Sequence, residues 1–403
     1  MSLLPVEAAL ERILARVPAP VAETVALARA SGRVLAEPLM AMHNQPPFDA
    51  SAMDGYAVRA ADVAPGMALR LIGTAQAGAG FAGDVGPGEC VRIFTGAPVP
   101  KGADAVIMQE EARIDGANVS FEEQPRSGRS IRPLGNDFRA GQELLAAGTL
   151  LTPLALSLAA TANAARLAVA RRARIAVLAT GDELVPPGSV LRPDQIVASN
   201  SYGLIPLLAP YAETVADLGI VTDERTDLER VLQAAFASGL DILVTTGGAS
   251  VGDRDIVQDV LQDLGVVLDF WRIAMRPGKP LMFGTSGRTL IFGLPGNPVS
   301  AMVTATVFIK PALRQWLGVA DPLGQRLRLP LAAPTPPNTA RRHFMRATIE
   351  TGESGATEVR PIAETDSGHT SSLAQADALI VQVENDPGQP AGIMVEVLPL
   401  SGF

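Results

Sequence analysis

The sequence has 403 residues, of which 47% are hydrophobic and only 4% aromatic, and its net charge is −9 at pH 7. This length predicts about two to four domains, and the acidic balance argues against a nucleic-acid partner. One cysteine, Cys90, and three scattered histidines exclude an internal disulfide framework and argue against a zinc site or a His-based catalytic triad. Because no apolar run has the length of a membrane span and the N-terminus lacks a signal-peptide pattern, we expect a cytoplasmic protein without membrane contact.

Helical patterns near the start of the chain predict a region that links the other domains. Apolar residues recur at helical spacing over residues 5–17 and 21–30, and Gly32 is expected to cap the second helix at its C-terminal end. Thr152 and Pro153 are typical of a helix start, here for a helix that extends to residue 164. We therefore predict a discontinuous helical linking domain made of residues 1–45 and 141–172.

Between these two segments the pattern changes to short strands broken by glycines, which predicts an inserted β-rich domain over residues 46–140. Three polar residues of this domain stand beside or between glycines in turns: Asp54, Thr95 and Asp137. Asp-Gly is a common turn dipeptide, so Asp54 has a purely local interpretation beside a functional one.

Residues 173–320 alternate buried strands with helices, which is typical of a three-layer α/β domain with a mostly parallel sheet. In such sheets ligands bind outside the carboxyl ends of the strands. Polar or glycine-rich loops follow the predicted strands, namely Thr-Gly-Asp-Glu at 180–183, Asp223, Thr-Gly-Gly at 246–248, Arg-Pro-Gly-Lys-Pro at 276–280 and Pro-Gly-Asn-Pro at 295–298. Their convergence on one edge of the sheet favours a binding site over a set of unrelated turns.

One of these loops has the pattern of a phosphate site. Residues 241–255 predict a strand, a glycine-rich turn and a helix start, which together direct backbone N–H groups and a helix dipole at an anion. Thr246 and Ser250 add hydroxyl donors, and Asp253 and Asp255 are placed either to cap the helix or to hold a divalent cation. Taken alone, the stretch fits an ordinary βα turn with an N-cap equally well.

After residue 320 a proline-rich linker leads into a series of short strands, which predicts a small C-terminal β domain over residues 325–403. Arg341, Arg342 and Arg346 form a basic cluster in it, and Ser367 lies in a polar turn. Most basic runs of this kind are solvated strand faces.

Together these residues favour one class of chemistry. Arg276 and Lys279 supply positive potential for an oxyanion, and five carboxylates offer the hard oxygen ligands that Mg²⁺ prefers: Asp54, Asp137, Glu183, Asp223 and Asp255. The residues therefore predict metal-assisted chemistry on a phosphoanhydride, with positioning and electrostatics contributing most of the catalysis. They do not identify the group that is transferred.

Six motifs, in order, resemble those of the MoeA and gephyrin E-domain family of molybdopterin molybdenumtransferases over essentially the full chain. They are Ser-Ala-Met-Asp-Gly-Tyr-Ala at 51–57, Thr-Gly-Ala-Pro-Val-Pro at 95–100, Thr-Gly-Asp-Glu-Leu at 180–184, Thr-Gly-Gly-Ala-Ser-Val-Gly-Asp at 246–253, Arg-Pro-Gly-Lys-Pro at 276–280 and Leu-Pro-Gly-Asn-Pro at 294–298. The resemblance implies four domains, the central one of the molybdopterin-binding, MogA-like type. It also implies a homodimer, in which the cleft lies between the β-rich domain of one subunit and the central and C-terminal domains of the other.

The resemblance implies that molybdate is inserted into adenylylated molybdopterin with Mg²⁺ and that AMP is released. The implied catalytic set is Asp54, Thr95, Asp137, Glu183, Asp223 and Asp255, of which Asp54, Glu183 and Asp255 would hold the metal. The implied contacts to adenylylated molybdopterin are Thr180, Gly181, Asp182, Gly247, Gly248, Ser250, Gly252, Pro295, Asn297 and Pro298. The implied molybdate pocket is Arg272, Arg276, Lys279, Pro280, Arg346 and Ser367. Transient contact with the molybdopterin adenylyltransferase and with acceptor molybdoenzymes is expected as well.

Two points qualify the resemblance. Many family members have lysine where Arg272 and Arg276 stand here, and arginine offers a planar fork of donors instead of a point charge. Two other functions stay open, namely that of the adenylyltransferase itself and that of a non-catalytic, gephyrin-like scaffold. Retention of all the acidic motif residues argues against a pure scaffold.

Overall fold

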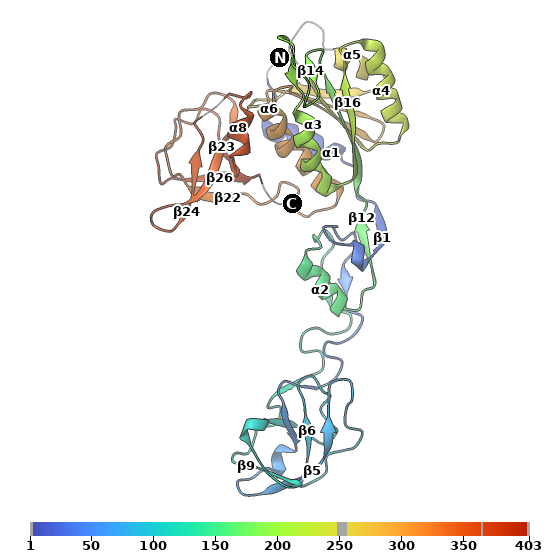
Figure 1. Ribbon diagram of the computed structural model, residues 1–403, viewed down its shortest axis with the longest axis vertical. Coiled ribbons are helices and arrows are strands. Elements are labelled where there is room, and N and C mark those ends of the chain that lie inside the picture. Colours follow the sequence, from blue (N-terminus) through green and yellow to red (C-terminus); the bar gives the residue numbers. More distant parts are fainter. Residues whose placement is uncertain (1–2, 248–255, 364–365, 401–403) are drawn as a thin grey trace.

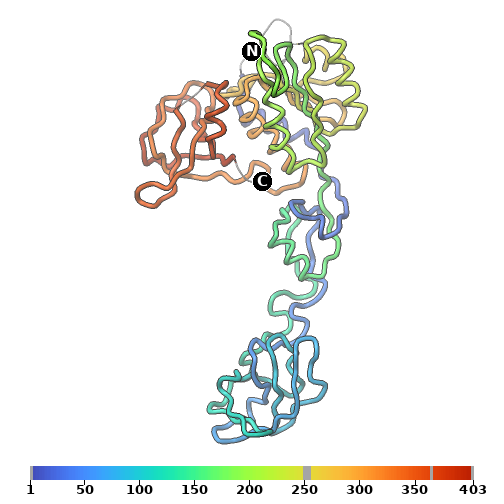
Figure 2. Tube along the Cα trace, in the orientation of Figure 1, coloured from blue at the N-terminus to red at the C-terminus, as the bar shows by residue number. Residues whose placement is uncertain are grey.

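The computed structural model describes residues 3–247, 256–363 and 366–400. The molecule is elongated (Figure 1): the α/β and C-terminal domains lie beside each other at one end, and the β-rich domain lies at the opposite end. A narrow linking region joins the two ends, and the chain passes through it twice (Figure 2). The multidomain α/β fold predicted from the sequence is confirmed. None of the helices in the described ranges is long and apolar enough to cross a membrane.

The inserted domain is built on a six-stranded sheet with the strand order β7-β4-β6-β5-β9-β8. Its strands are β4 (Gly55–Val58), β5 (Ala68–Ala75), β6 (Glu89–Ile93), β7 (Ala105–Met108), β8 (Ala112–Asp115) and β9 (Asn118–Phe121). The flanking elements are β3 (Ala50–Ser51), which pairs with β10 (Ile131–Arg132), and the 3-10 helices η2 (Ala60–Asp62) and η3 (Gln109–Glu111). Neighbouring residues such as Ala57 and Val58 belong to different buried clusters, so both faces of the sheet are covered.

The linking region contains one predicted helix and lacks another. Helix α2 (Pro153–Thr161) begins as predicted, because the Thr152 side chain accepts a hydrogen bond from Ala155 N. The helix predicted for residues 21–30 is wrong: this segment forms β1 (Ala22–Ala26) and a short 3-10 turn, η1 (Leu27–Arg29). All five residues of β1 pair antiparallel with β12 (Arg166–Ala170), so pairing with a distant strand overrides the local helical pattern. A second pair, β2 (Leu39–Met40) with β11 (Glu143–Leu145), continues the link.

The first predicted helix is confirmed as α1 (Val6–Arg16), and it packs on the α/β domain. Its apolar face, including Val6, Leu10 and Ile13, belongs to the same buried cluster as Ile175 and Phe292 of the central sheet. The N-terminal helix therefore lies apart from the rest of the linking region, as its position beside the central sheet in Figure 1 also shows.

The central sheet has the order β16-β13-β17-β21-β20-β18. Four neighbouring strands pair in parallel, namely β13 (Ala173–Thr180), β16 (Ala212–Val221), β17 (Ile242–Thr246) and β21 (Thr289–Leu294). At one edge β20 (Pro280–Ser286) pairs antiparallel with β21, and β18 (Val267–Arg272) pairs antiparallel with β20. The helices are α3 (Asn200–Leu208), η4 (Ala209–Tyr211), α4 (Arg225–Ala237), α5 (Ile256–Asp263), α6 (Pro298–Thr304), the π-helical η5 (Ala305–Ile309) and α7 (Lys310–Trp316). A short parallel pair, β14 (Leu184–Val185) with β15 (Ile196–Val197), lies beside the sheet.

Successive side chains of β13 point to opposite faces of the central sheet, so helices cover both faces and the domain has three layers. Ile175 and Val177 point into the cluster that includes α1, α3, α6 and α7, whereas Ala176 and Leu178 point into the cluster beneath α4 and α5. A strand that is buried on both faces has a continuous apolar sequence, and this is the pattern from which it was predicted.

The C-terminal domain contains β22 (Leu327–Pro330), β23 (Arg342–Thr351), β24 (Thr357–Pro361), α8 (Thr370–Ala374), β25 (Ala378–Gln382) and β26 (Met394–Pro399). Its sheet also receives a strand from the central domain, because β19 (Met275–Arg276) pairs in parallel with β23. This shared strand connects the basic loop after β18 directly to the C-terminal domain.

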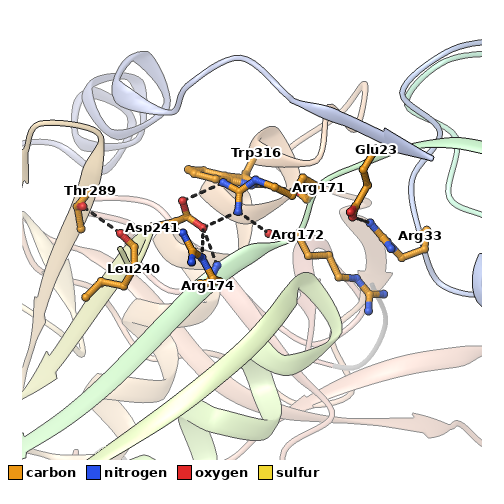
Figure 3. A network of polar contacts seen from close by, with 9 residues as sticks. All are labelled: Glu23, Arg33, Arg171, Arg172, Arg174, Leu240, Asp241, Thr289 and Trp316. Carbon is orange, nitrogen blue, oxygen red and sulfur yellow. Dashed lines mark hydrogen bonds and ion pairs between the residues drawn. The ribbon is translucent and has the colours of Figure 1, made fainter. Parts of the chain in front are cut away.

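A polar network fixes the linking region to the α/β domain (Figure 3). Arg171, just after β12, donates to both carboxylate oxygens of Asp241 at 2.9 Å, and Arg174 N donates to the same carboxylate at 2.8 Å. Trp316 Nε1 donates to Arg171 O at 3.0 Å, and the Arg171 guanidinium lies 5.4 Å from the centroid of the indole. The end of β12 is thus held to the start of β17 and to the end of α7.

Candidate active site

A cavity of about 380 Å³ lies at the carboxyl edge of the parallel strands β13, β17 and β21. Seven residues predicted for the site line it: Thr180, Glu183, Gly247, Pro280, Pro295, Asn297 and Pro298. The cavity is also lined by Asn200 at the start of α3 and by residues of the β14–β15 pair. The strand-end loops therefore converge as expected from the sequence.

Gly247 brings two strand ends into close contact. Its φ of +88° is rarely adopted by other residues, and a Cβ atom here would lie 2.2 Å from Thr180 O. The glycine therefore permits a backbone approach that any side chain would block, and it keeps the floor of the cavity open.

Two buried polar atoms of the cavity wall have no hydrogen-bond partner within the described ranges: Thr180 Oγ1 and Asn200 Oδ1. Thr180 is only 2% exposed, and Asn200 uses its amide nitrogen to donate to Gly296 O at 2.8 Å. Leaving a buried polar atom unpaired costs free energy, so both atoms are suited to a bound ligand. The hydroxyl can donate or accept, and the amide oxygen can accept from an N–H or O–H group.

We expect Gly247→Ala to destabilise the protein more than Gly265→Ala does. Both glycines have positive φ, but a Cβ at Gly265 (φ +86°) would meet no atom within 4 Å. Gly265→Ala should therefore cost about 1 kcal/mol of backbone strain, and Gly247→Ala about 1–3 kcal/mol more for the clash with Thr180 O. Thermal unfolding of the two variants provides the comparison, and equal melting temperatures would show that the strand ends can separate without cost.

Acidic residues gather beside the cavity. Asp182 Oδ1 accepts a hydrogen bond from Asp223 N at 3.0 Å, and Glu183 lines the cavity itself. Burial raises the pKa of Asp223, and the charges of Asp182 and Glu183 raise it further. Because these carboxylates repel one another, a cation bound nearby would be stabilised.

A second predicted group lies in the β-rich domain, at the other end of the molecule. Asp54 Oδ1 accepts from Thr95 N at 2.7 Å and from Thr95 Oγ1 at 2.8 Å. These two bonds, with a contribution from the charge of Arg92, lower the pKa of Asp54, which is therefore ionised at neutral pH. The neighbouring Gly55 is required for packing, since a Cβ there would lie 1.9 Å from Ile107 O. Asp137 is exposed and donates its N–H to Gln45 O at 2.9 Å.

The basic residues lie where the central and C-terminal domains meet. Asn297 Nδ2 donates to Ser367 Oγ at 2.9 Å, which joins the cavity wall to the polar turn of the C-terminal domain. Arg346 is buried and donates to Asp366 O, His369 O and Ser372 Oγ, so it anchors the same turn. Arg272 stacks on Trp271 with 4.2 Å between guanidinium carbon and ring centroid, and Lys279 is exposed.

The structure thus brings together only part of the predicted site. The cavity residues, the acidic cluster and the basic loop share one end of the molecule, whereas Asp54 and Thr95 belong to the β-rich domain at the other (Figure 1). Asp137 lies where the linking region meets the β-rich domain, since the next residue, Phe138, packs in the core of the linking region. Gly248, Ser250, Gly252, Asp253 and Asp255 lie outside the described residues. Among the residues that are described, no three His, Cys, Asp or Glu side chains form a group that could hold a metal ion, so the metal set of Asp54, Glu183 and Asp255 stays a prediction.

Two residues that the sequence did not single out are part of this region. Asn200 is the first residue of α3 and lines the cavity, and its polar side chain at a helix start is the feature by which the sequence could have indicated it. His343 lies within the basic run at 341–346 and contacts Arg276, with 3.0 Å between Arg276 Nη2 and His343 Nδ1. The scattered positions of the histidines gave no sign of this contact.

Three segments that together span most of the chain match protein families of known description. Residues 4–163 match the family described as the MoeA N-terminal region (domain I and II), residues 176–315 the probable molybdopterin binding domain, and residues 328–400 the MoeA C-terminal region (domain IV). The molybdopterin molybdenumtransferase of Haemophilus influenzae is 38% identical, with 78% of each chain aligned, and that of Bacillus subtilis is 33% identical over 98% of this chain and 94% of its own. The chain belongs to the molybdopterin molybdenumtransferase family.

The solved structures agree with this assignment. The molybdopterin biosynthesis MoeA protein of Pyrococcus horikoshii superposes with a TM-score of 0.85 at 27% identity, covering 99% of this chain and all of that one. The family membership predicted from the six motifs is confirmed. The cavity at the strand ends falls within the residues that match the molybdopterin-binding domain of the family, since its lining extends from Ala179 to Pro298.

Proposed function

We propose that this protein inserts molybdenum into molybdopterin, using molybdate and adenylylated molybdopterin as substrates and releasing AMP. The observation that carries this proposal is the contact between the strand-end cavity and the polar turn of the C-terminal domain, which is made by the hydrogen bond from Asn297 to Ser367 and anchored by Arg346. A nucleotide-bearing substrate and an oxyanion can therefore bind side by side.

The cavity residues suit the nucleotide-bearing substrate. Gly247 allows close backbone approach, and Thr180 and Asn200 present the unpaired polar atoms described above. Pro295, Asn297 and Pro298 line the same cavity, and Gly181 and Asp182 follow Thr180 directly in the chain. We assign these five residues to the nucleotide-bearing substrate, and Gly248, Ser250 and Gly252 to the same role on their motif alone. Fixed donors that face the phosphoanhydride would stabilise charge as it develops on the departing AMP.

The basic residues suit molybdate. Arg276 and Lys279 occupy the loop that leads to Pro280 on the cavity wall, while Arg346 holds the turn that carries Ser367. Arg272 lies at the end of the neighbouring strand β18. Guanidinium groups present parallel N–H donors that match the edge of a tetrahedral oxyanion, so we assign these residues and Pro280 to the molybdate pocket.

The donor chemistry of the site suits Mg²⁺, since Glu183 and its acidic neighbours offer hard oxygen ligands whose mutual repulsion a cation would relieve. Such an ion would neutralise charge on the phosphoanhydride. We propose that Glu183 and Asp255 of one subunit and Asp54 of another hold it, with Thr95 orienting Asp54 and with Asp137 and Asp223 close by.

This arrangement requires a homodimer. Within one chain, Asp54 belongs to the β-rich domain and Glu183 to the α/β domain, and these domains lie at opposite ends of the molecule, so a complete site needs the β-rich domain of a second copy. We further propose that the enzyme works in the cytoplasm without a nucleic-acid or membrane partner, that it receives substrate from the molybdopterin adenylyltransferase, and that it passes product to acceptor molybdoenzymes.

The test is an AMP-release assay with the purified full-length chain. Adenylylated molybdopterin, molybdate and Mg²⁺ should give AMP and molybdenum cofactor in equal amounts, with no AMP when molybdate is omitted. ATP-dependent loading of AMP onto free molybdopterin would instead indicate the adenylyltransferase. Absence of both reactions from a folded protein would contradict an enzymatic role and leave that of a scaffold.

A further inference from the structure

Arg92 lies beside the turn that presents Asp54 and Thr95. It belongs to β6, and its register partner in the antiparallel pair with β4 is Tyr56. The guanidinium carbon lies 5.2 Å from the centroid of the Tyr56 ring and 4.6 Å from that of Phe94. Contacts with two aromatic rings thus restrict where the guanidinium can lie.

The guanidinium holds two residues that are joined to Asp54. Arg92 Nη1 donates to Gly55 O at 2.7 Å, and Arg92 Nη2 donates to Gln109 Oε1. Gly55 follows Asp54 in the chain, and Gln109 N donates to Asp54 O at 3.1 Å. The backbone of Asp54 is therefore connected to Arg92 by a covalent bond on one side and by a hydrogen bond on the other.

The strand that carries Arg92 also leads to the partner of the Asp54 side chain. Thr95, three residues after Arg92, donates its N–H and its hydroxyl to Asp54 Oδ1. Arg92 Nη1 makes a second, longer bond to Ile93 O at 3.3 Å, in the segment between them. One guanidinium thus connects the segment that carries Thr95 with the segment that carries Asp54.

Hydrogen bonds have more influence than packing on the orientation of Asp54. Asp54, Thr95 and Gln109 are all exposed, whereas Gly55 is buried. An exposed side chain has rotamer freedom that must be lost whenever a site assembles around it. A network that fixes the backbone and the carboxylate in advance removes this cost.

We propose that Arg92 is a positioning residue for catalysis at Asp54: its guanidinium fixes Gly55 and Gln109, so that the carboxylate keeps one orientation. The inference rests on the proposed function, which assigns Asp54 to the metal. Arginine is suited to this role because its planar fork of donors spans two acceptors, whereas the ammonium of lysine is a point charge.

Arg92→Lys separates the geometry from the charge. Lysine keeps a positive charge beside Asp54 but loses the fork that spans the two acceptors. The rate of AMP release at saturating substrate should fall by about 10-fold, and KM for adenylylated molybdopterin should change by less than about twofold, because the substrate cavity is untouched. The matched control is Arg70→Lys in the neighbouring strand β5, where Arg70 is exposed and pairs with Glu89. This control should retain full activity.

A double variant tests whether Arg92 acts through Asp54. In an Asp54→Asn background, Arg92→Lys should lower the remaining rate by no more than about twofold, because the group that it positions has already lost its charge. Full activity of Arg92→Lys in the wild-type background, or an equal loss in both backgrounds, would overturn the proposal.

Hydrogen exchange of the Thr95 amide, measured by mass spectrometry on the full-length chain, tests the positioning without turnover. This N–H donates to Asp54 Oδ1 at 2.7 Å, so its protection shows whether the carboxylate stays in place. It should exchange about 10-fold faster in Arg92→Lys and at the wild-type rate in Arg70→Lys, while the strands of the β-rich sheet stay protected in both.

The two measurements distinguish this inference from the proposed function. Unchanged exchange of the Thr95 amide in Arg92→Lys would contradict the positioning role. Faster exchange in a chain whose wild-type form releases no AMP would support the hold of Arg92 on Asp54 and refute the proposed function instead.

Discussion

Replacing Asp54 by asparagine should lower the rate of AMP release by about 100-fold or more, because it removes a charge while keeping the local geometry. The amide oxygen of asparagine can still accept both hydrogen bonds that Thr95 donates to Asp54 Oδ1. Asp54 is exposed, so the change should alter the free energy of unfolding by no more than about 0.5 kcal/mol. The AMP-release assay and thermal unfolding of the same preparation measure the two effects.

Asp62→Asn is the matched control for this experiment. Asp62 belongs to the same β-rich domain, accepts a hydrogen bond from Gly88 N at 3.2 Å and pairs with Arg59. It should retain full activity, because it has no part in the proposed cleft. If Asp54→Asn unfolds the domain, or if both variants keep normal turnover, Asp54 is a structural turn residue and the local interpretation from the sequence is correct.

A mixture of two inactive variants should recover activity if the cleft is shared between subunits. Asp54→Asn inactivates the β-rich half of a site, and Glu183→Gln inactivates the central half. A heterodimer of the two has one site with both defects and one site with neither. Because random exchange makes half of the dimers heterodimers, about a quarter of the wild-type activity should return after the subunits are mixed.

The alternative arrangement predicts a different result. If Asp54 and Glu183 of the same chain formed one site, each site of every heterodimer would carry a defect and mixing would restore nothing. A double variant, with both substitutions in one chain, is the control: mixed with either single variant, it should recover no activity in either arrangement. Dilution of the wild-type enzyme to concentrations well below the dissociation constant of the dimer should also abolish turnover.

The secondary structure was predicted best for strands that are buried on both faces of the sheet and for the loops that follow them. Strands β13, β17 and β21 appear as continuous apolar runs, and the loops after them carry Thr180, Gly247 and Asn297 to one cavity, as predicted. The helix prediction for residues 21–30 was wrong because β1 in this segment pairs with β12, about 140 residues away, and no local pattern reveals that pairing.

Long-range contacts also limited the prediction of the site. Asp54 and Thr95 were both recognised, but their hydrogen bonds join residues 41 positions apart. His343 was missed because its only distinction is its contact with Arg276, 67 positions away. The metal set stays a prediction for a further reason: Asp54 belongs to the β-rich domain and Glu183 to the α/β domain at the opposite end of the molecule, so in the proposed site they would meet only across two subunits.

The junction of Arg171 with Asp241 and Trp316 joins the α/β domain to the linking region that leads to the β-rich domain. In the proposed dimer, a small rotation at this junction would become a large displacement of the distant β-rich domain, so the angular stiffness of these few bonds would determine how accurately Asp54 reaches a partner's cleft. Residues that touch neither substrate nor metal, such as Asp241, would then affect the geometry of the active site as much as the residues of the cavity do.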